Sequence, residues 1–231
     1  MIAELKGAGK EYQTGDQTIV ALQPTDLQLN EGELLLIIGP SGSGKTTLLS
    51  LLGCVIYPSY GDLFVAGQYV NKLNAKELAQ LRLQTIGFVF QNFNLLAPLT
   101  AEENVAVPLR LLGVSRSEIK QRVAQALETV GMTERRNYLP RQLSGGQQQR
   151  IAIARALVTQ PRLVLCDEPT ASLDKNSLKL VMQELRTLAK NGKAVAVVTH
   201  DPRLQQYADR AVEVKNGYVK PIEIQKVSFD E

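Results

Sequence analysis

The sequence predicts an α/β fold with a mainly parallel sheet, an N-terminal antiparallel β-subdomain and an inserted α-helical subdomain. Apolar runs at residues 34–38, 163–166 and 194–199 are separated by helical stretches, which is the arrangement of a parallel sheet. A glycine-rich segment follows the first run, two carboxylates follow the second and a histidine follows the third. Because parallel sheets bind ligands at the carboxyl ends of their strands, we expect one site at that edge.

The composition is that of a folded chain with a substantial core. The chain has 231 residues, 44% of them hydrophobic, which is enough for one large domain or one domain with a sizeable insertion. The net charge is +3 and the positive residues are spread, which favours neither nucleic acid nor an anionic membrane surface as a partner. No apolar run approaches the ~18 residues of a membrane span, and the start lacks a signal peptide's apolar core, so we expect a soluble cytosolic chain. Cys54 and Cys166 are too few for a disulfide framework and are expected to be buried thiols.

Residues 39–46 match the pattern G-x-x-x-x-G-K-[ST] of a phosphate-binding loop. Glycines in such a loop let backbone N–H groups point at phosphate oxygens, and the following helix adds the positive end of its dipole. Lys45 supplies a cation to the β- and γ-phosphates, and Thr46 a hydroxyl to Mg²⁺. The helix is predicted to end at Gly53, interpreted as its C′ residue. The predicted anion site comprises Gly39, Ser41, Gly42, Ser43, Gly44, Lys45, Thr46 and Thr47.

Two short strands are predicted before this loop, at residues 2–5 and 19–29, with a turn signal at 14–16. Tyr12 stands in the polar connection between them. From its position alone it is either a packed surface aromatic or a platform on which adenine stacks.

After the loop, the pattern predicts a hairpin around residues 62–70, a helix over 75–84 and a strand over 85–90. The strand ends at Gln91. This glutamine is either a polar strand terminus or a ligand for an ion or a water.

Residues 92–142 change character and are predicted to be helical throughout. Ser115 and Glu118 form a capping box, and apolar residues at helical spacing, Ile119, Val123, Leu127 and Val130, form a packing face. The segment 92–99 is apolar, contains proline and has no helical period, so it is alternatively an exposed contact loop.

The run Leu-Ser-Gly-Gly-Gln at residues 143–147 leads into another helix. Ser144 is a good N-cap, and Gly145 and Gly146 at a helix N-terminus leave N–H groups free for an anion. The run is therefore either a second phosphate-binding element or simply a capped helix.

Two adjacent carboxylates, Asp167 and Glu168, end the next apolar strand. In a protein with a phosphate loop, such a strand holds Mg²⁺ through its first carboxylate, and the second can act on an attacking water as base or orienting group. Unpaired carboxylates after an apolar run are otherwise costly. A turn at 169–174 then leads into a helix over 176–190, and the following strand delivers His200, the only histidine. A final hairpin is predicted around the Asn216-Gly217 dipeptide.

With these motifs in this order, including 172–174, the chain resembles the ATP-binding subunit of an ABC transporter. The resemblance implies ATP and Mg²⁺ as cofactors. It implies that Tyr12 stacks on adenine, and that Ser144, Gly145 and Gly146 close over ATP bound by a partner subunit. The catalytic residues that it implies are Lys45, Gln91, Glu168 and His200. The metal residues that it implies are Thr46, Gln91 and Asp167.

The resemblance also implies one ABC ATPase domain over residues 1–231. Residues 1–91 and 160–231 would form the RecA-like core with the β-subdomain, and about 92–159 the helical signature subdomain. The implied partners are ATP, a second copy in a nucleotide-sandwich homodimer and an integral-membrane permease, but no nucleic acid. The subunit would lie in the cytoplasm, on the inner face of the cell membrane, and a groove lined by Phe93, Leu95 and Leu96 would suit a helix of the permease. The alternative is that these three residues belong to the helical core.

Within the family, the runs around residues 81–91 and 93–105 look most like the lipoprotein-releasing and macrolide-exporting branch. That branch usually has glycine where Ala171 stands, alanine where Cys166 stands, and Pro-Thr-Ser-Gly where the sequence has Tyr-Pro-Ser-Tyr-Gly at 57–61. The alternatives are an importer or cell-division subunit with the same core, and a soluble ATPase acting on nucleic acid or ribosomes. A binding module without turnover is a further alternative, against which the intact Glu168 argues.

Overall fold

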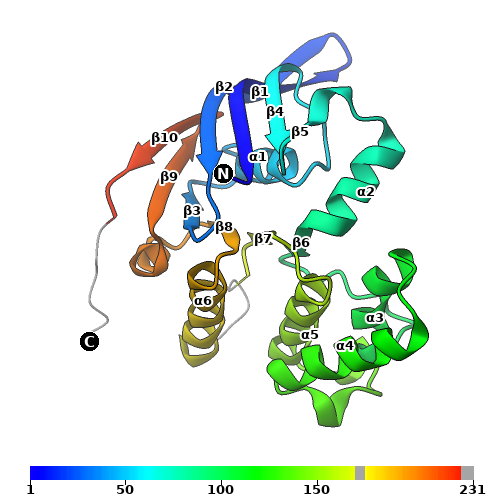
Figure 1. Cartoon of the computed structure of the whole chain (residues 1–231). Coiled ribbons are helices and arrows are strands. Elements are labelled where there is room, and N and C mark those ends of the chain that lie inside the picture. The colour runs from blue at the N-terminus through cyan, green and yellow to red at the C-terminus, as the bar shows by residue number, and fades with distance from the viewer. Residues whose placement is uncertain (170–174, 225–231) are drawn as a thin grey trace.

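Figure 1 shows the computed structural model of the chain, which describes residues 1–169 and 175–224. A four-stranded antiparallel sheet of order β2-β1-β4-β5 forms the top of this view. Its strands are β1 (Ala3–Thr14), β2 (Gln17–Leu29), β4 (Tyr60–Val65) and β5 (Gln68–Tyr69). The predicted hairpin around residues 62–70 is β4 and β5.

A six-stranded sheet of order β10-β9-β3-β8-β7-β6 forms the centre. Its strands are β3 (Leu34–Ile38), β6 (Ile86–Val89), β7 (Leu163–Asp167), β8 (Ala194–Thr199), β9 (Arg210–Lys215) and β10 (Tyr218–Ile222). Strands β9, β3, β8, β7 and β6 run parallel, and β10 returns antiparallel to β9 through the predicted turn. The predicted mainly parallel sheet is confirmed.

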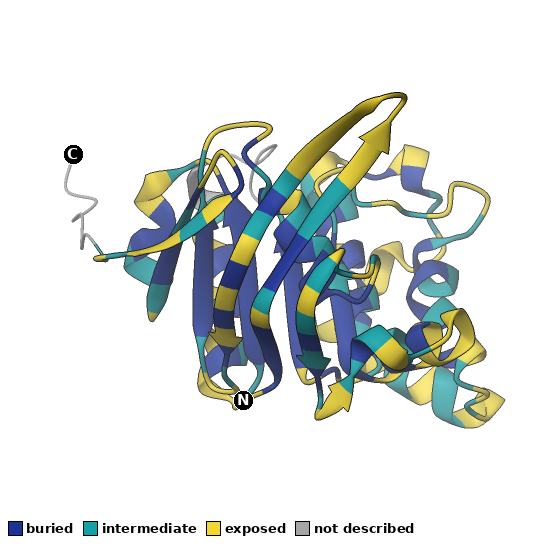
Figure 2. Cartoon of the chain, turned by 90° about the horizontal axis from the view of Figure 1, so that it is seen from above, coloured by how far each residue is buried: buried dark blue, intermediate teal, exposed yellow. Residues whose placement is uncertain are grey.

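The central sheet separates two hydrophobic cores. Successive β3 residues point to opposite faces, so Leu35 and Ile37 join one core while Leu34 and Leu36 join the other. The first core contains helix α1 (Lys45–Leu52), which lies between the two sheets (Figure 1). Figure 2 shows that the strands of the central sheet are largely buried, whereas the far end of the β1–β2 hairpin is exposed.

Four helices pack residues into the second core. They are α3 (Ala101–Leu111), α4 (Arg116–Thr129), α5 (Gly145–Leu157) and α6 (Lys175–Lys190). Helix α2 (Ala75–Thr85) connects β5 to β6, and short 3-10 turns occupy Val70–Lys72, Thr133–Arg135, Pro140–Gln142 and Pro202–Tyr207. None of the helices within 1–169 and 175–224 is both long and apolar enough to cross a membrane.

The expectation that residues 92–142 are helical throughout is wrong. Residues 92–100 contain no helix, because Phe93 and Asn94 take left-handed φ values of 59° and 47° and a proline follows at position 98. The alternative of a loop at 92–99 is what the structure has. The predicted packing face of α4 is confirmed at Val123 and Leu127, which are buried.

The expected short strands at 2–5 and 19–29 are parts of one longer hairpin. Strand β1 continues to Thr14, and Tyr12 pairs with Ile19 on β2 instead of standing in a loop. Backbone pairing extends this hairpin up to a tight turn at residues 15–16, although the side chains near its end are polar and exposed. Sequence patterning could not detect this extension, because it needs no buried side chains.

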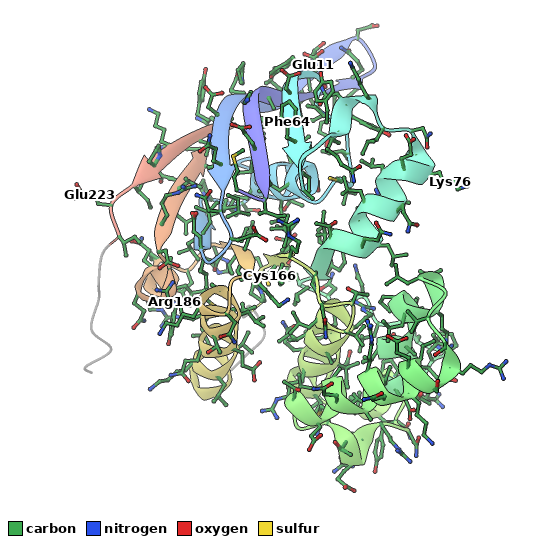
Figure 3. All side chains as sticks on the ribbon, in the orientation of Figure 1. Glu11, Phe64, Lys76, Cys166, Arg186 and Glu223 are labelled. Carbon is green, nitrogen blue, oxygen red and sulfur yellow. The ribbon has the colours of Figure 1, made fainter. Side chains whose placement is uncertain are left out.

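Gly53 does not have the backbone conformation expected of a C′ glycine. Its φ is −82°, and it is Cys54 that has a left-handed φ of 53°. Position 53 needs glycine for space, since a Cβ there would lie 2.0 Å from Cζ of Phe88. Cys54 and Cys166 are buried free thiols, as predicted, and burial raises the pKa of Cys54 to about 12. Figure 3 labels Cys166 on β7 in the middle of the molecule.

Gly53→Ala should therefore destabilise the fold by overpacking. We expect the free energy of unfolding to fall by ~1–3 kcal/mol. Adding Phe88→Leu should relieve the clash, so the double variant should be more stable than the sum of the two single effects predicts. Gly145→Ala is the control, because a Cβ at that position meets nothing within 4 Å. Chemical denaturation measures all four proteins, and an equal effect at positions 53 and 145 would contradict the packing argument.

Candidate functional site

The predicted phosphate loop forms the turn between β3 and α1. Gly44, at the N-cap of α1, has a left-handed φ of 108°, and a Cβ there would lie 2.4 Å from the carbonyl oxygen of Ala21. A Cβ at Gly39 would lie 2.1 Å from the carbonyl oxygen of Val214. Strands β2 and β9 thus pack their main chains directly against the loop, which leaves room only for glycine at these two positions.

Two polar side chains of the loop are buried within it. Lys45 is 7% exposed, and its Nζ donates hydrogen bonds to the carbonyls of Gly39 (2.9 Å) and Pro40 (2.8 Å). The Ser43 hydroxyl is buried with no hydrogen-bond partner among the described residues. A fixed ammonium and an unpartnered hydroxyl in one loop are suited to an anionic ligand.

A cavity of about 400 Å³ opens beside the loop. Its lining residues are Ile19, Val20, Ala21, Gly42, Ser43, Gly44, Lys45, Thr46, Thr47, Asn216 and Gly217. The predicted residues from 42 to 47 are thus gathered around one space, with Ser41 exposed beside them.

Sequence reasoning missed the walls that β2 and the β9–β10 turn contribute to this cavity. The turn is tied to the loop, because the N–H of Gly217 donates to the carbonyl of Ser43 at 2.9 Å. Its Asn-Gly dipeptide predicted a hairpin, but its position depends on β9 pairing with β3. Pairing between distant strands has no local signal in the sequence.

Tyr12 lies next to the cavity but does not line it. It is 41% exposed and pairs with Ile19, which is a lining residue. Lys10 holds its ammonium 5.3 Å from the centroid of the Tyr12 ring. The ring is therefore available to a ligand that extends along β2.

The carboxylate Asp167 meets the phosphate loop at the end of β7. Burial and the neighbouring Glu168 carboxylate raise the pKa of Asp167 above its usual range, against the opposing effects of the Lys45 charge and a hydrogen bond with the Thr46 hydroxyl. The structure thus brings Asp167 next to Lys45 and Thr46, which precede it by more than a hundred positions in the sequence. A cation at this point would favour the charged form of Asp167.

Glu168 is turned toward His200 by an unusual backbone conformation. Its φ is 47°, which is uncommon for a residue other than glycine, and its N–H donates to the carbonyl of Val198 at 2.9 Å. One carboxylate oxygen, Oε1, lies 3.0 Å from Nδ1 of His200, and the other, Oε2, is buried with no partner among the described residues. An unpartnered carboxylate oxygen can accept a proton or orient a water.

Gln91 lies at the same edge of the sheet. It follows β6 by two residues and is exposed, and the last residue of β6, Val89, pairs with Cys166, directly before Asp167. At this edge β6 is followed by Gln91, β7 ends at Asp167 with Glu168 directly after it, and β8 is followed by His200.

Ser144, Gly145 and Gly146 are not part of this group. Ser144 caps α5 in a capping box with Gln147, and among the described residues no hydrogen bond or ion pair joins this helix start to the phosphate loop. Ser144 and Gly145 are exposed. The predicted residues Ala171 and 172–174 lie outside the described residues.

A second cavity, of about 640 Å³, lies between α2, β6, α3 and α5. Its lining is mostly apolar, with Val55, Leu83, Phe88, Phe90 and Leu111 among the lining residues. Its charged lining residues, Lys76, Arg82 and Arg155, are all cationic. Figure 3 labels Lys76 on the outer side of α2.

Of the loop at 92–99, Asn94 lines this cavity, whereas Phe93, Leu95 and Leu96 do not. Leu95 packs against the second core, as the alternative held, and Leu96 is 47% exposed. A groove lined by these three residues stays a prediction. The guanidinium of Arg155 donates to the carbonyls of Phe93 (2.7 Å) and Asn94 (2.6 Å), and this contact holds the left-handed turn in place. The loop is thus held in a fixed conformation beside the second cavity.

The profile of the ABC transporter family matches residues 22–171. The chain belongs to the ABC transporter family. The chain is an ATP-binding cassette of this family, as its resemblance to the family implied.

Relatives of this cassette include macrolide export ATP-binding/permease proteins. MacB of Photorhabdus laumondii is 45% identical and MacB of Shewanella sp. is 43% identical, each over 94% of this chain. The cassette spans about a third of the length of these relatives, 34% in both cases.

Solved ABC cassettes share its fold. A dimeric post-hydrolysis state of the cassette MJ0796, bound to ADP and Pi, is 40% identical with a TM-score of 0.91, over 97% of this chain and 99% of that one. CbiO1 from Clostridium perfringens, part of the complex cbiONQ, is 29% identical with a TM-score of 0.83, over 95% and 86% of the two chains. The predicted fold class is confirmed.

Lys45→Ala should strongly weaken nucleotide binding, because it removes the cation of the phosphate loop. We expect ADP affinity to fall at least about 30-fold, as for the loss of charge-assisted hydrogen bonds worth ~2 kcal/mol. Lys193→Ala is the control, since Lys193 also donates to a carbonyl, that of Pro161 at 2.7 Å, but does not line the cavity. Calorimetric titration with ADP measures both variants. ADP affinity within threefold of wild type in Lys45→Ala would contradict the assignment.

Proposed function

We propose that this cassette hydrolyses Mg²⁺-ATP at sites completed by a second copy of the chain, and that the cycle drives a membrane permease. The observation that carries the proposal is that the chain has two half-sites that do not meet. The phosphate loop with Asp167 and Glu168 forms one, and the exposed start of α5 forms the other. Phosphoryl transfer needs donors around the γ-phosphate on all sides, and a phosphate loop covers only one.

Glycine at position 145 supports the second half-site. A Cβ there would meet nothing within 4 Å, and no left-handed φ requires glycine. Glycine in a helix is less favourable than alanine by about 0.5–1 kcal/mol, so the chain's own packing does not account for it. Close approach of a ligand held by another subunit would account for glycine at this position. MJ0796, which resembles this chain over nearly its whole length, is a dimer with bound ADP and Pi.

The residues at the end of β7 fit a Mg²⁺ ion. Asp167 is half-buried beside a second carboxylate and next to the Thr46 hydroxyl. We assign Thr46, Gln91 and Asp167 to the ion, directly or through water, since Mg²⁺ usually takes one or two carboxylates with phosphate and water oxygens. No cluster of three or more His, Cys, Asp or Glu residues exists in the described part of the chain, and this small ligand set does not need one. The bound ion would neutralise charge on the phosphate oxygens.

Hydrolysis is assigned to Glu168 with His200. The buried Oε2 of Glu168 is free to accept a proton from an attacking water, while the contact of Oε1 with His200 fixes the orientation of the carboxylate. Lys45 and the loop N–H groups bind the phosphates. Tyr12, Ile19 and Val20 provide an apolar surface on which the adenine stacks.

Glu168→Gln should leave ADP affinity within twofold of wild type and lower ATP turnover at least about 100-fold, a contribution typical of acid–base groups. The arrested variant should become a dimer in Mg²⁺-ATP but not in ADP, because only the γ-phosphate reaches Ser144 and its glycines. Single-turnover assays measure hydrolysis, and size-exclusion chromatography with light scattering measures the mass.

Glu184→Gln is the control, since Glu184 is a partly desolvated glutamate on α6 outside the site. It should keep wild-type turnover. Unchanged hydrolysis in Glu168→Gln would refute its role as base. A variant that stays monomeric in saturating Mg²⁺-ATP would refute the sandwich.

The groove between α2, β6, α3 and α5 is proposed as the permease contact. Its apolar lining with three cationic residues suits a short amphipathic helix that carries an acidic side chain. Sequence identity of 45% with macrolide export proteins favours an exporter-type partner over an importer or cell-division complex. The subunit would then lie at the inner face of the cell membrane. The division into a core of residues 1–91 and 160–231 and a helical subdomain of 92–159 belongs to the same proposal.

Leu111→Ser should weaken the permease contact without affecting the ATP site. Leu111 lines the groove and is 69% exposed, so we expect a melting temperature within about 2 °C of wild type and basal ATP hydrolysis within twofold. Copurification with the co-expressed permease should fall at least fivefold. Leu180→Ser is the control, because Leu180 is also exposed, at 51%, but lies on α6 outside the groove. Equal copurification of the two variants would exclude the groove as the docking site.

A further inference from the structure

Tyr60 reaches from β4 across β1 to the strand that walls the nucleotide cavity. It pairs with Gly9 of β1, and a Cβ at Gly9 would lie 2.1 Å from Cε2 of Tyr60. The ring therefore lies over the space that a side chain at position 9 would occupy. Its hydroxyl donates a hydrogen bond to the carbonyl of Leu22 on β2, at 2.8 Å.

This hydrogen bond falls where the antiparallel sheet is irregular. The β1–β2 register shifts on both sides of Lys10, which is the partner of Leu22, and the β1–β4 register shifts between Lys6 and Gly9. Such shifts disrupt the local ladder and bend the strands. A side chain that spans three strands can fix their relative position where the ladder does not.

Leu22 lies between the two β2 residues that hold the phosphate loop. On one side the carbonyl of Ala21 packs against Gly44. On the other side the N–H of Gln23 donates to the carbonyl of Gly217 at 2.9 Å, and Gly217 in turn donates to Ser43 at 2.9 Å. Any shift of β2 at Leu22 would therefore move the cavity wall relative to the loop.

We propose that Tyr60 is a positioning residue for nucleotide binding, whose hydroxyl fixes β2 at Leu22 and so sets the distance between the wall at residues 19–21 and the phosphate loop. This inference rests on the proposed function, in which the cavity holds ATP with its base along β2. Tyr60 does not line the cavity itself. Its effect is on the shape of the base and ribose end, and it takes no part in the chemistry.

The chain offers a matched control in Tyr57. The Tyr57 hydroxyl also donates to a main-chain carbonyl at 2.8 Å, that of Leu73, which does not line the cavity. Tyr60→Phe and Tyr57→Phe thus remove the same kind of hydrogen bond. Both are expected to lower the melting temperature by a similar small amount.

The test measures ligand affinity and kinetics in the full chain. In Tyr60→Phe we expect ADP affinity to fall about 3- to 10-fold, the loss of one hydrogen bond, with a matching rise in KM for ATP and kcat within twofold. Affinity for tripolyphosphate, which has no base or ribose, should stay within twofold. Tyr57→Phe should leave all these quantities unchanged.

Three results would overturn the inference. Equal ADP affinity in the two tyrosine variants would make Tyr60 a packing residue only. A parallel loss of tripolyphosphate and ADP affinity in Tyr60→Phe would place the effect in the phosphate loop instead of the wall. A wild-type chain that binds neither ADP nor ATP would refute the proposed function, and this inference with it. A wild-type chain that binds ADP, with equal ADP affinity in the two tyrosine variants, would refute this inference alone.

Discussion

The packing of main chain against main chain around the β3–α1 turn is the constraint on which the rest of the site depends. Carbonyls of β2 and β9 approach the loop so closely that Gly39 and Gly44 have no room for a Cβ. Lys45 closes the turn from inside by donating to two of its carbonyls. The loop therefore keeps its shape only while β9 stays in register with β3 and β2 keeps its position against the loop. The antiparallel sheet and the C-terminal hairpin are, in this sense, parts of the phosphate site.

The parallel sheet gathers the remaining chemistry at one edge. Parallel strands in register end together, so residues after β6, β7 and β8 become neighbours although they are far apart in sequence. The left-handed backbone at Glu168 then directs its carboxylate toward His200. Strain of this kind persists where the surrounding structure holds it, here through the hydrogen bond of Glu168 N–H to Val198.

The sequence predicted those parts of the fold and of the candidate site whose residues are contiguous in the chain or end a buried strand. Apolar runs located the parallel strands, and the phosphate loop and Asp167 followed from local patterns. The wall formed by Ile19 and Gly217 was not predictable, because it depends on pairing between distant strands. Gly53 was misinterpreted because a helix-terminal glycine has two physical causes, backbone conformation and space. Only the position of Phe88 distinguishes them.

Helix α5 connects the two surfaces on which the proposed cycle depends. In the proposed cycle its start would present Ser144 and Gly145 to the partner's nucleotide. Near its end, Arg155 donates hydrogen bonds to the carbonyls of Phe93 and Asn94 beside the groove. The helix has 13 residues and spans about 20 Å, without a proline or an internal glycine that would let it bend. A displacement of its start by ATP would therefore be transmitted to the groove as a rigid movement of the helix. Because Arg155 bonds only to main-chain carbonyls of this loop, the transmission does not depend on which side chains the loop carries.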